Sequence, residues 1–161
     1  MQVEMKIKGL MVDPVTNMPI VILKDESDDR VLPIWVGIFE ANAIALRIED
    51  IETPRPMTHD LLRNLLESLQ ASVEKVVVTD LKDNTYFAQI HLQVDGSERH
   101  VDARPSDAIA LALRVEAPIY VEQEVLDQSS ALDQDGAPTD SERLRRWFEG
   151  LDPEDFSKYE M

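Results

Sequence analysis

The stretch "RHVDARPSDAIALALR" (residues 99–114) decides the fold, because the chain changes there from a strand to a helix. Residues 99–103 read as the end of a strand, and an apolar helical run follows at 108–113. Between them lies the polar corner Arg104-Pro105-Ser106-Asp107. Proline and an acidic residue are typical of a first helical turn, so the corner either caps the helix or forms a site at its N-terminus.

Around this stretch, the hydrophobic pattern predicts seven strands, at residues 3–12, 18–23, 31–36, 73–81, 86–94, 98–103 and 118–121. The turn residues Lys82-Asp83-Asn84 and Asp95-Gly96 predict hairpins between neighbouring strands. Pro33 predicts that the third strand lies at a sheet edge or at a bulge, because proline cannot donate a ladder hydrogen bond.

Helices are predicted at residues 38–48 and 58–71 and directly after Arg104. The first and third are rich in alanine and apolar on most sides, which is typical of buried helices. Their sequences are similar, with "ANAIALRIED" at 41–50 and "AIALALRVEA" at 108–117. This similarity indicates either an internal duplication or two buried helices that both need small side chains. The second carries a leucine stripe, made of Leu61, Leu62, Leu65, Leu66 and Leu69. We therefore predict an α+β fold, a mainly antiparallel twisted sheet packed by two Ala-rich helices and one Leu-striped helix.

Composition restricts the classes of function. The chain has 161 residues and a formal net charge of −16, which argues against tight, non-specific binding of nucleic acid through phosphate contacts alone. It has no cysteine, which excludes disulfides and thiolate metal sites. No signal peptide and no membrane-spanning run are apparent, so we expect a cytoplasmic protein that does not enter a membrane.

The composition changes near residue 128. We predict a domain over residues 1–128, followed over 129–161 by an acidic linker and a short amphipathic helix with Leu144, Trp147 and Phe148 on one side. Exposed sheet edges and this apolar stripe predict a homo-oligomer, most simply a dimer.

Polar residues gather at the start of each predicted helix: Glu40 with Asn42, His59 with Asp60, and the corner from Asp102 to Asp107. Unpaired N–H groups and the positive end of the helix dipole lie at such positions. Capping explains each cluster separately, but as a set they predict one shared pocket. His91 and His100 are expected at the surface of a hairpin.

Three segments in this order, "LPIWVGIFEANAIAL" (32–46), "RPMTHDLLRNLLESL" (55–69) and "VDARPSDAIALALR" (101–114), resemble the bifunctional nuclease domain family. The resemblance covers about residues 1–126. It implies an α+β fold, common in bacterial proteins, and nuclease activity on RNA and DNA. The positions that match the family's motifs are Glu40, Asn42, His59, Asp60, Asp102, Arg104, Ser106 and Asp107.

The leading hypothesis is metal-dependent hydrolysis of phosphodiester bonds in nucleic acid. Glu40, Asp102 and Asp107 are the predicted ligands of Mg²⁺ or Mn²⁺, because carboxylates suit hard cations. The predicted catalytic residues are His59 as base or acid, Arg104 as phosphate holder, Asp60 and Ser106. Two alternatives remain open, namely a non-catalytic oligomeric interaction module and a binder of a small phosphorylated ligand at the helix starts.

Overall fold

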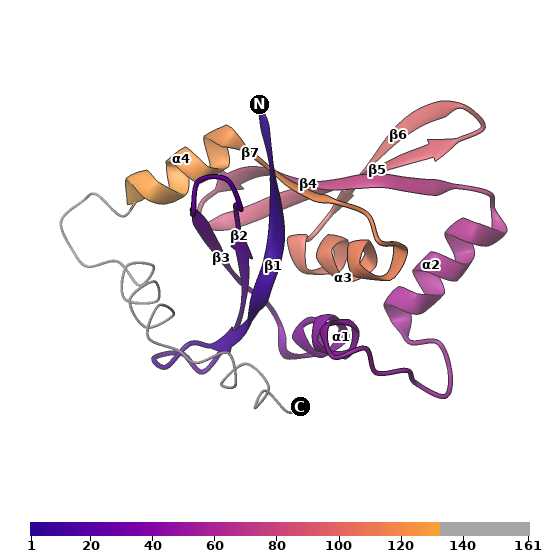
Figure 1. The fold of residues 1–161 in the computed structure, drawn as a ribbon, viewed down its shortest axis with the longest axis horizontal. Coiled ribbons are helices and arrows are strands. Elements are labelled where there is room, and N and C mark those ends of the chain that lie inside the picture. Colours follow the sequence, from indigo (N-terminus) through magenta and orange to yellow (C-terminus); the bar gives the residue numbers. More distant parts are fainter. Residues whose placement is uncertain (133–161) are drawn as a thin grey trace.

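The computed structural model describes residues 1–132 and shows the predicted α+β architecture (Figure 1). The elements are β1 (Gln2–Val12), β2 (Pro19–Lys24), β3 (Val31–Trp35), α1 (Ile38–Ile48), α2 (Thr58–Ser68), β4 (Ser72–Lys82), β5 (Thr85–Val94), β6 (Ser97–Ala103), α3 (Pro105–Val115), β7 (Ile119–Glu122) and α4 (Gln123–Leu132). The predicted C-terminal helix with Trp147 lies outside the described residues.

Seven strands form one sheet in the order β3-β2-β1-β7-β4-β5-β6. Every pairing is antiparallel except that of β4 with β7. β1 joins the two halves, since residues 2–5 pair with β7 and residues 6–12 pair with β2. β3 lies at an edge, as Pro33 predicts.

Both predicted hairpin turns are present. Asp83 and Asn84 between β4 and β5, and Asp95 and Gly96 between β5 and β6, all have positive φ angles. A two-residue turn with this geometry matches the twist of the flanking strands. The turns therefore fix the register of β4, β5 and β6.

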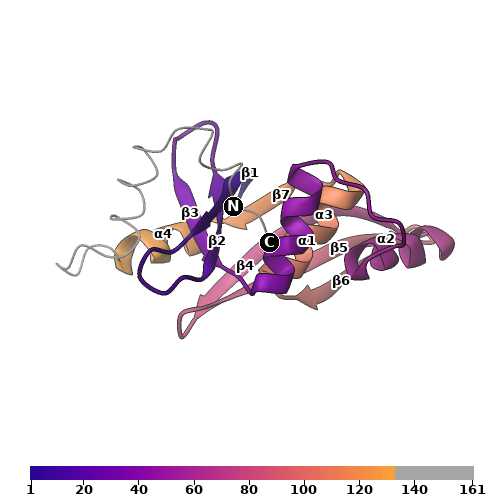
Figure 2. The same cartoon turned by 90° about the horizontal axis from the view of Figure 1, so that it is seen from below.

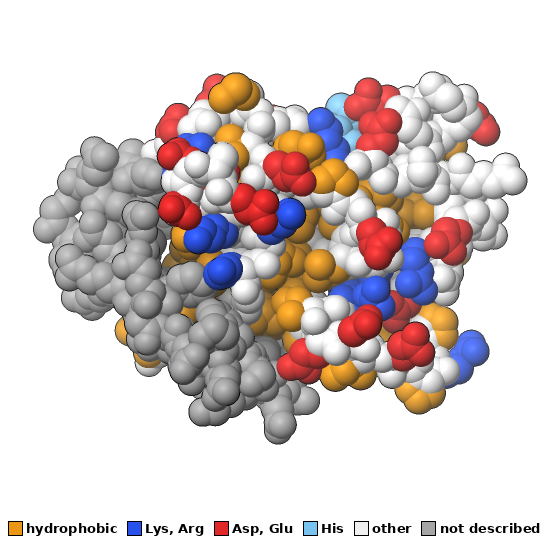
Figure 3. All heavy atoms as spheres, viewed as in Figure 1, with side chains coloured by type: hydrophobic (Ala, Val, Ile, Leu, Met, Phe, Trp, Pro, Cys, Tyr) orange, Lys and Arg blue, Asp and Glu red, His pale blue; other side chains and the backbone are white. Residues whose placement is uncertain are grey.

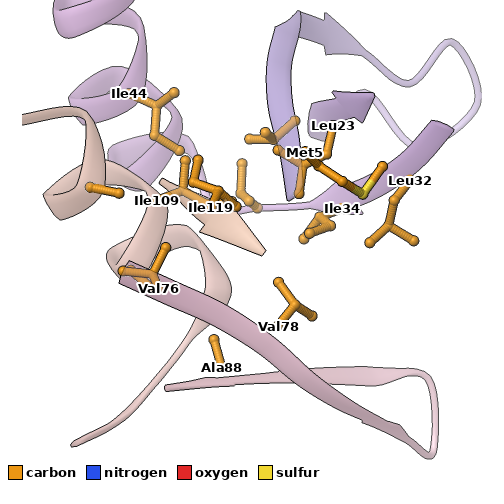
Figure 4. Close-up of a cluster of buried hydrophobic side chains, with 14 of the residues drawn as sticks. Met5, Leu23, Leu32, Ile34, Ile44, Val76, Val78, Ala88, Ile109 and Ile119 are labelled. Atoms are coloured by element: carbon orange, nitrogen blue, oxygen red, sulfur yellow. The ribbon is translucent and has the colours of Figure 1, made fainter. Parts of the chain in front are cut away.

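Helices α1 and α3 pack against each other and cover one face of the sheet (Figures 1 and 2). Figure 4 shows Ile44 of α1 and Ile109 of α3 directed into the same core as Val76 of β4 and Ile119 of β7. All of these side chains are buried. The small alanines allow the close approach of α1 and α3, whereas the proposed internal duplication remains a hypothesis.

The prediction that the leucine stripe of α2 packs on the sheet is wrong. α2 lies at the periphery beside α3 (Figure 2), and Leu61, Leu65 and Leu69 are 51%, 50% and 72% exposed. Its attachment is largely polar, because side chains of its first turn bind charged residues of α3. The amphipathic pattern predicted the helix correctly, but it did not predict which part of the molecule packs against it.

Helix α4 was not predicted. It begins directly after β7 and continues through residues 129–132, where a linker is expected from the sequence. Val125 and Leu126 are buried in the core, which explains why the chain continues as a helix there. No helix within residues 1–132 is long and apolar enough to cross a membrane.

Candidate functional site

The starts of all three helices on the covered face come together at one place. The Arg104 side chain, from the N-cap of α3, bridges two carboxylates, with Nε 2.9 Å from Asp107 Oδ2 and Nη2 2.9 Å from Glu40 Oε1 of α1. Asp107 Oδ1 lies 2.9 Å from Nε2 of His59 in the first turn of α2. We call these four residues the Asp107 cluster. Its existence confirms that the three helix starts converge.

Asp107 is ionised within this cluster. Burial by itself raises the pKa of its carboxyl group, but hydrogen bonds from His59 and Arg104, together with their charges, lower that pKa below its usual value. The Arg104 pKa is raised, first by its hydrogen bond to Asp107 and then by the one to Glu40. The arrangement therefore keeps a carboxylate and a guanidinium charged at neutral pH.

His59 is held in one orientation. The residue is 7% exposed, and an ionised Asp107 accepts only from a protonated nitrogen, which assigns the ring proton to Nε2 when His59 is neutral. Nδ1 then carries the lone pair. A carboxylate that orients a histidine in this way also stabilises the imidazolium formed when the histidine takes up a proton.

Glu40 folds back over the start of its own helix. A Cβ placed on Gly37 would collide with Glu40 Oε2, so glycine at the N-cap of α1 leaves room for this side chain. A larger residue at position 37 would require the Glu40 carboxylate to shift.

The Asp107 cluster lines a pocket of about 360 Å³. Asn42, Met57 and Phe39 complete part of its wall, and Phe39 is 87% exposed. Asn42, one of the positions that match the family's motifs, lines this pocket. A larger hollow of about 670 Å³ lies between the start of β1 and the β2–β3 turn, and it contains none of the predicted site residues.

Asp60, predicted as catalytic, holds the helices together. Its Oδ1 accepts a 2.7 Å hydrogen bond from Nε of Arg114, and its Oδ2 accepts one from the backbone N–H of Met57. Arg114 also donates to the carbonyl oxygens of Ala110 and Ala43, so it joins α1, α2 and α3. The sequence analysis missed Arg114. Its signal was a lone arginine in an otherwise apolar helix.

Asp102 and Ser106 do not join the cluster. Asp102 is exposed and lies opposite Gln89 in the ladder, on the face of β6 that also carries His100. Ser106 is buried in the first turn of α3, and no hydrogen bond connects its hydroxyl to the Asp107 cluster. Their predicted roles stay predictions without geometric support.

The predicted metal ligands do not form a set. Asp102 lies apart from Glu40 and Asp107, and the oxygens of those two carboxylates already face Arg104 and His59. Within residues 1–132, one group of three acidic or histidine side chains has ligand atoms close enough to hold an ion, and it does not include these residues. The donor set therefore does not fit a metal held by Glu40, Asp102 and Asp107 together.

A second, basic hollow adjoins the pocket and shares Leu46 with it. Its volume is about 230 Å³, and Arg47, Arg55 and Arg63 line it together with the buried Arg114. Figure 3 shows basic side chains gathered over the junction of α1, α2 and α3, with acidic side chains around them. This cluster could not be recognised from the sequence, because Arg47, Arg55 and Arg63 come from a helix, a loop and another helix, and the total charge is strongly negative.

Comparison with known proteins agrees with the resemblance in the motifs. Residues 21–134 match the family described as "Bifunctional nuclease domain". An uncharacterized protein of Mycobacterium tuberculosis is 38% identical over 162 residues, which cover 95% of this chain and 97% of the relative.

Plant relatives match over a shorter span. Bifunctional nuclease 1 of rice (Oryza sativa subsp. indica) is 27% identical and that of Arabidopsis thaliana 28% identical, each over 116 residues. These matches cover 70% of this chain but only 35% and 36% of the plant proteins. The family match over residues 21–134 includes the starts of α1, α2 and α3, and the chain belongs to the bifunctional nuclease domain family.

Proposed function

We propose that this chain is a nuclease that hydrolyses phosphodiester bonds in RNA, DNA or both at the Asp107 cluster. The observation that carries the proposal is the continuous chain of contacts from Glu40 through Arg104 and Asp107 to His59, which lines one pocket. The family and the names of the plant relatives support the reaction class.

The four side chains suit general acid–base chemistry on a phosphodiester. Nδ1 of His59 takes a proton from the attacking water molecule, and Asp107 stabilises the resulting imidazolium. The water oxygen bonds to phosphorus as the bond from phosphorus to the leaving oxygen breaks, and the leaving oxygen gains a proton from the imidazolium, directly or through solvent, which returns His59 to its neutral form. An arginine offers more N–H groups than the two that bind Asp107 and Glu40, and the side chain of Arg104 is 65% exposed. Its free donors can therefore hold a non-bridging phosphate oxygen.

The basic hollow supports a polyanionic substrate despite the net charge of −16. Arg47, Arg55 and Arg63 lie next to the pocket, where they can contact phosphates that flank the cleaved bond. A local basic cluster of this kind attracts nucleic acid to this region of the surface, although the net negative charge of the protein repels it elsewhere. Binding of a small phosphorylated ligand uses the same groups, and the absence of cleavage by a protein that binds nucleotides would favour that alternative.

Divalent metal dependence is a separate part of the proposal. Mg²⁺ commonly uses one or two protein carboxylates plus substrate phosphates, so Glu40 or Asp107 could assist an ion that arrives with the substrate. No step above is routed through such an ion. Cleavage with Mg²⁺ or Mn²⁺ that stops with chelator would support the metal requirement, and equal cleavage in chelator would remove it.

The decisive variant is His59→Gln, which keeps a polar side chain but cannot act as a base. We expect it to cleave single-stranded RNA and DNA about 10²- to 10⁴-fold more slowly than the parent protein, because a positioned general base contributes that much. Rates are measured on end-labelled oligonucleotides with proteins purified in parallel. His100→Gln is the matched control, since His100 is exposed on β6, and it should cleave at the parental rate. Equal rates for His59→Gln and the parent would refute the assignment.

The exposed leucines of α2 favour a second candidate role, self-association. Leu61, Leu65 and Leu69 follow one another at a spacing of four residues, and all are at least half exposed. A stripe of this kind commonly marks an interaction surface. We expect the full chain to be a dimer by light scattering and the double variant Leu61→Ser/Leu65→Ser to be a monomer. A parent protein that is monomeric at micromolar concentration would contradict self-association, and a double variant that stays dimeric would contradict the leucine stripe as its interface.

A further inference from the structure

The β5–β6 hairpin carries a second group of titratable side chains that shares no residue with the Asp107 cluster. His91 of β5 and His100 of β6 lie directly opposite each other in the ladder, and their rings stack with centroids 3.8 Å apart. Glu98 lies two residues before His100 and therefore on the same face of β6. Its Oε1 is 2.9 Å from His100 Nε2 and 3.6 Å from His91 Nδ1.

His91 is the unusual member of this group. The expectation that it lies at the surface is wrong, because the residue is only 6% exposed, between Lys75 of β4 and His100 of β6. Neither of its ring nitrogens has a hydrogen-bond partner. Buried polar side chains usually have one, so a buried imidazole with two unpartnered nitrogens indicates a missing ligand.

We infer that His91, Glu98 and His100 bind one divalent transition-metal ion of the Zn²⁺ class. Two imidazoles and one carboxylate are the ligands that such ions prefer, whereas Mg²⁺ and Ca²⁺ take mainly oxygen ligands. The three ligand atoms lie within 4.8 Å of one another. Tetrahedral zinc places neighbouring ligand atoms about 3.3 Å apart, so the stacked rings of His91 and His100 must turn toward a common point to bind an ion.

The exposure of the group suits an open site. Glu98 and His100 have side chains 52% and 45% exposed, so they have room to turn toward a common point, and water can complete the coordination. Figure 3 shows histidine at the surface along the upper edge of the molecule, beside acidic and basic side chains. The bound ion would connect β5 to β6.

The neighbours of His91 leave its ring available to an ion, because neither ring nitrogen has a hydrogen-bond partner. Lys75, the cation on the neighbouring strand, donates to Gln2 Oε1 at 2.7 Å and lies over the Tyr120 ring. Its ammonium group therefore has partners of its own and is not a competing ligand.

The composition of the chain makes this site unusually testable. The protein has only three histidines, all within the described residues, and no cysteine. Full-length protein without a purification tag is titrated with ZnCl₂, and the histidine ring signals are followed by two-dimensional ¹H–¹⁵N NMR, with binding measured by calorimetry. We expect one ion to bind and to shift the ring signals of His91 and His100, while those of His59 stay unchanged.

Variants separate this site from adventitious binding by other carboxylates. Glu98→Gln and His100→Gln change exposed side chains, so both should fold, and each should weaken zinc binding at least about 10-fold because each removes a ligand. Glu67→Gln, the same change on an exposed glutamate of α2, is the matched control and should bind like the parent. Zinc that shifts only His59, that shifts no histidine, or that binds Glu98→Gln as tightly as the parent would overturn the inference.

Discussion

Two Asp–Arg pairs lie near the junction of α1, α2 and α3 but differ in what the arginine can still do. Asp60 with Arg114 and Asp107 with Arg104 have hydrogen bonds of 2.7 and 2.9 Å. The side chain of Arg114 is 1% exposed, whereas that of Arg104 is 65% exposed. The same type of ion pair therefore occurs once in the interior and once at the surface of a pocket.

The difference separates a structural pair from a functional one. Arg114 directs its N–H groups at Asp60 and at two backbone carbonyls, so it is committed to joining three helices. Arg104 binds two carboxylates and keeps further donors at the surface of the pocket. A buried charge pair is costly to break, while an exposed one contributes little to stability and is available to a ligand.

The largest expected effect on stability is that of Arg114→Ala. Removing one partner of a buried pair leaves an uncompensated carboxylate, so we expect the free energy of unfolding in urea to fall by about 3–5 kcal/mol. Arg104→Ala should cost no more than about 1 kcal/mol, because its guanidinium is largely solvated. Similar losses for both variants would contradict the distinction between the two pairs.

A smaller effect appears in the pH dependence of Asp60→Asn. Burial raises the pKa of Asp60, but its hydrogen bonds with the Met57 backbone and Arg114 outweigh this effect and hold that pKa below its usual value. At low pH the folded protein thus binds fewer protons than the unfolded chain. The stability that Asp60 contributes is fully present above the pKa that Asp60 has in the unfolded chain. It is lost as pH falls through the pKa that Asp60 has in the folded protein. The difference in unfolding free energy between parent and Asp60→Asn should therefore shrink as pH falls from about 6 to about 3. A constant difference would show that Asp60 does not titrate with folding.

The sequence predicted the parts of this arrangement that depend on local chemistry. Asp95-Gly96 determines a hairpin turn, and Pro105 with Asp107 marks the start of α3, because turn and cap preferences act over a few residues. The alternation of β5 and the alanine content of α1 and α3 also identified their elements. The convergence of Glu40, His59 and Asp107 was predicted because each lies in the polar first turn of a helix with an apolar side.

Long-range contacts could not be predicted from the same patterns. An amphipathic helix such as α2 needs some cover for its leucines, but the pattern does not say whether the sheet or another molecule supplies it. The role of Arg114 was missed because two of its three acceptors come from residues 43 and 60, which are distant in the sequence. His91 looked exposed because strand alternation ignores the side chains that Lys75 and His100 place around it.

The most direct test of the central claim is the cleavage rate of Asp107→Asn set against that of Asp60→Asn. Both changes remove one charge and keep the side-chain shape, but only Asp107 orients His59. At a temperature where both variants are folded, we predict that Asp107→Asn cleaves oligonucleotides at least about 100-fold more slowly than the parent, while Asp60→Asn keeps a rate near that of the parent. A full rate in Asp107→Asn, or equal losses in the two variants, would contradict the claim that the Asp107 cluster carries the reaction.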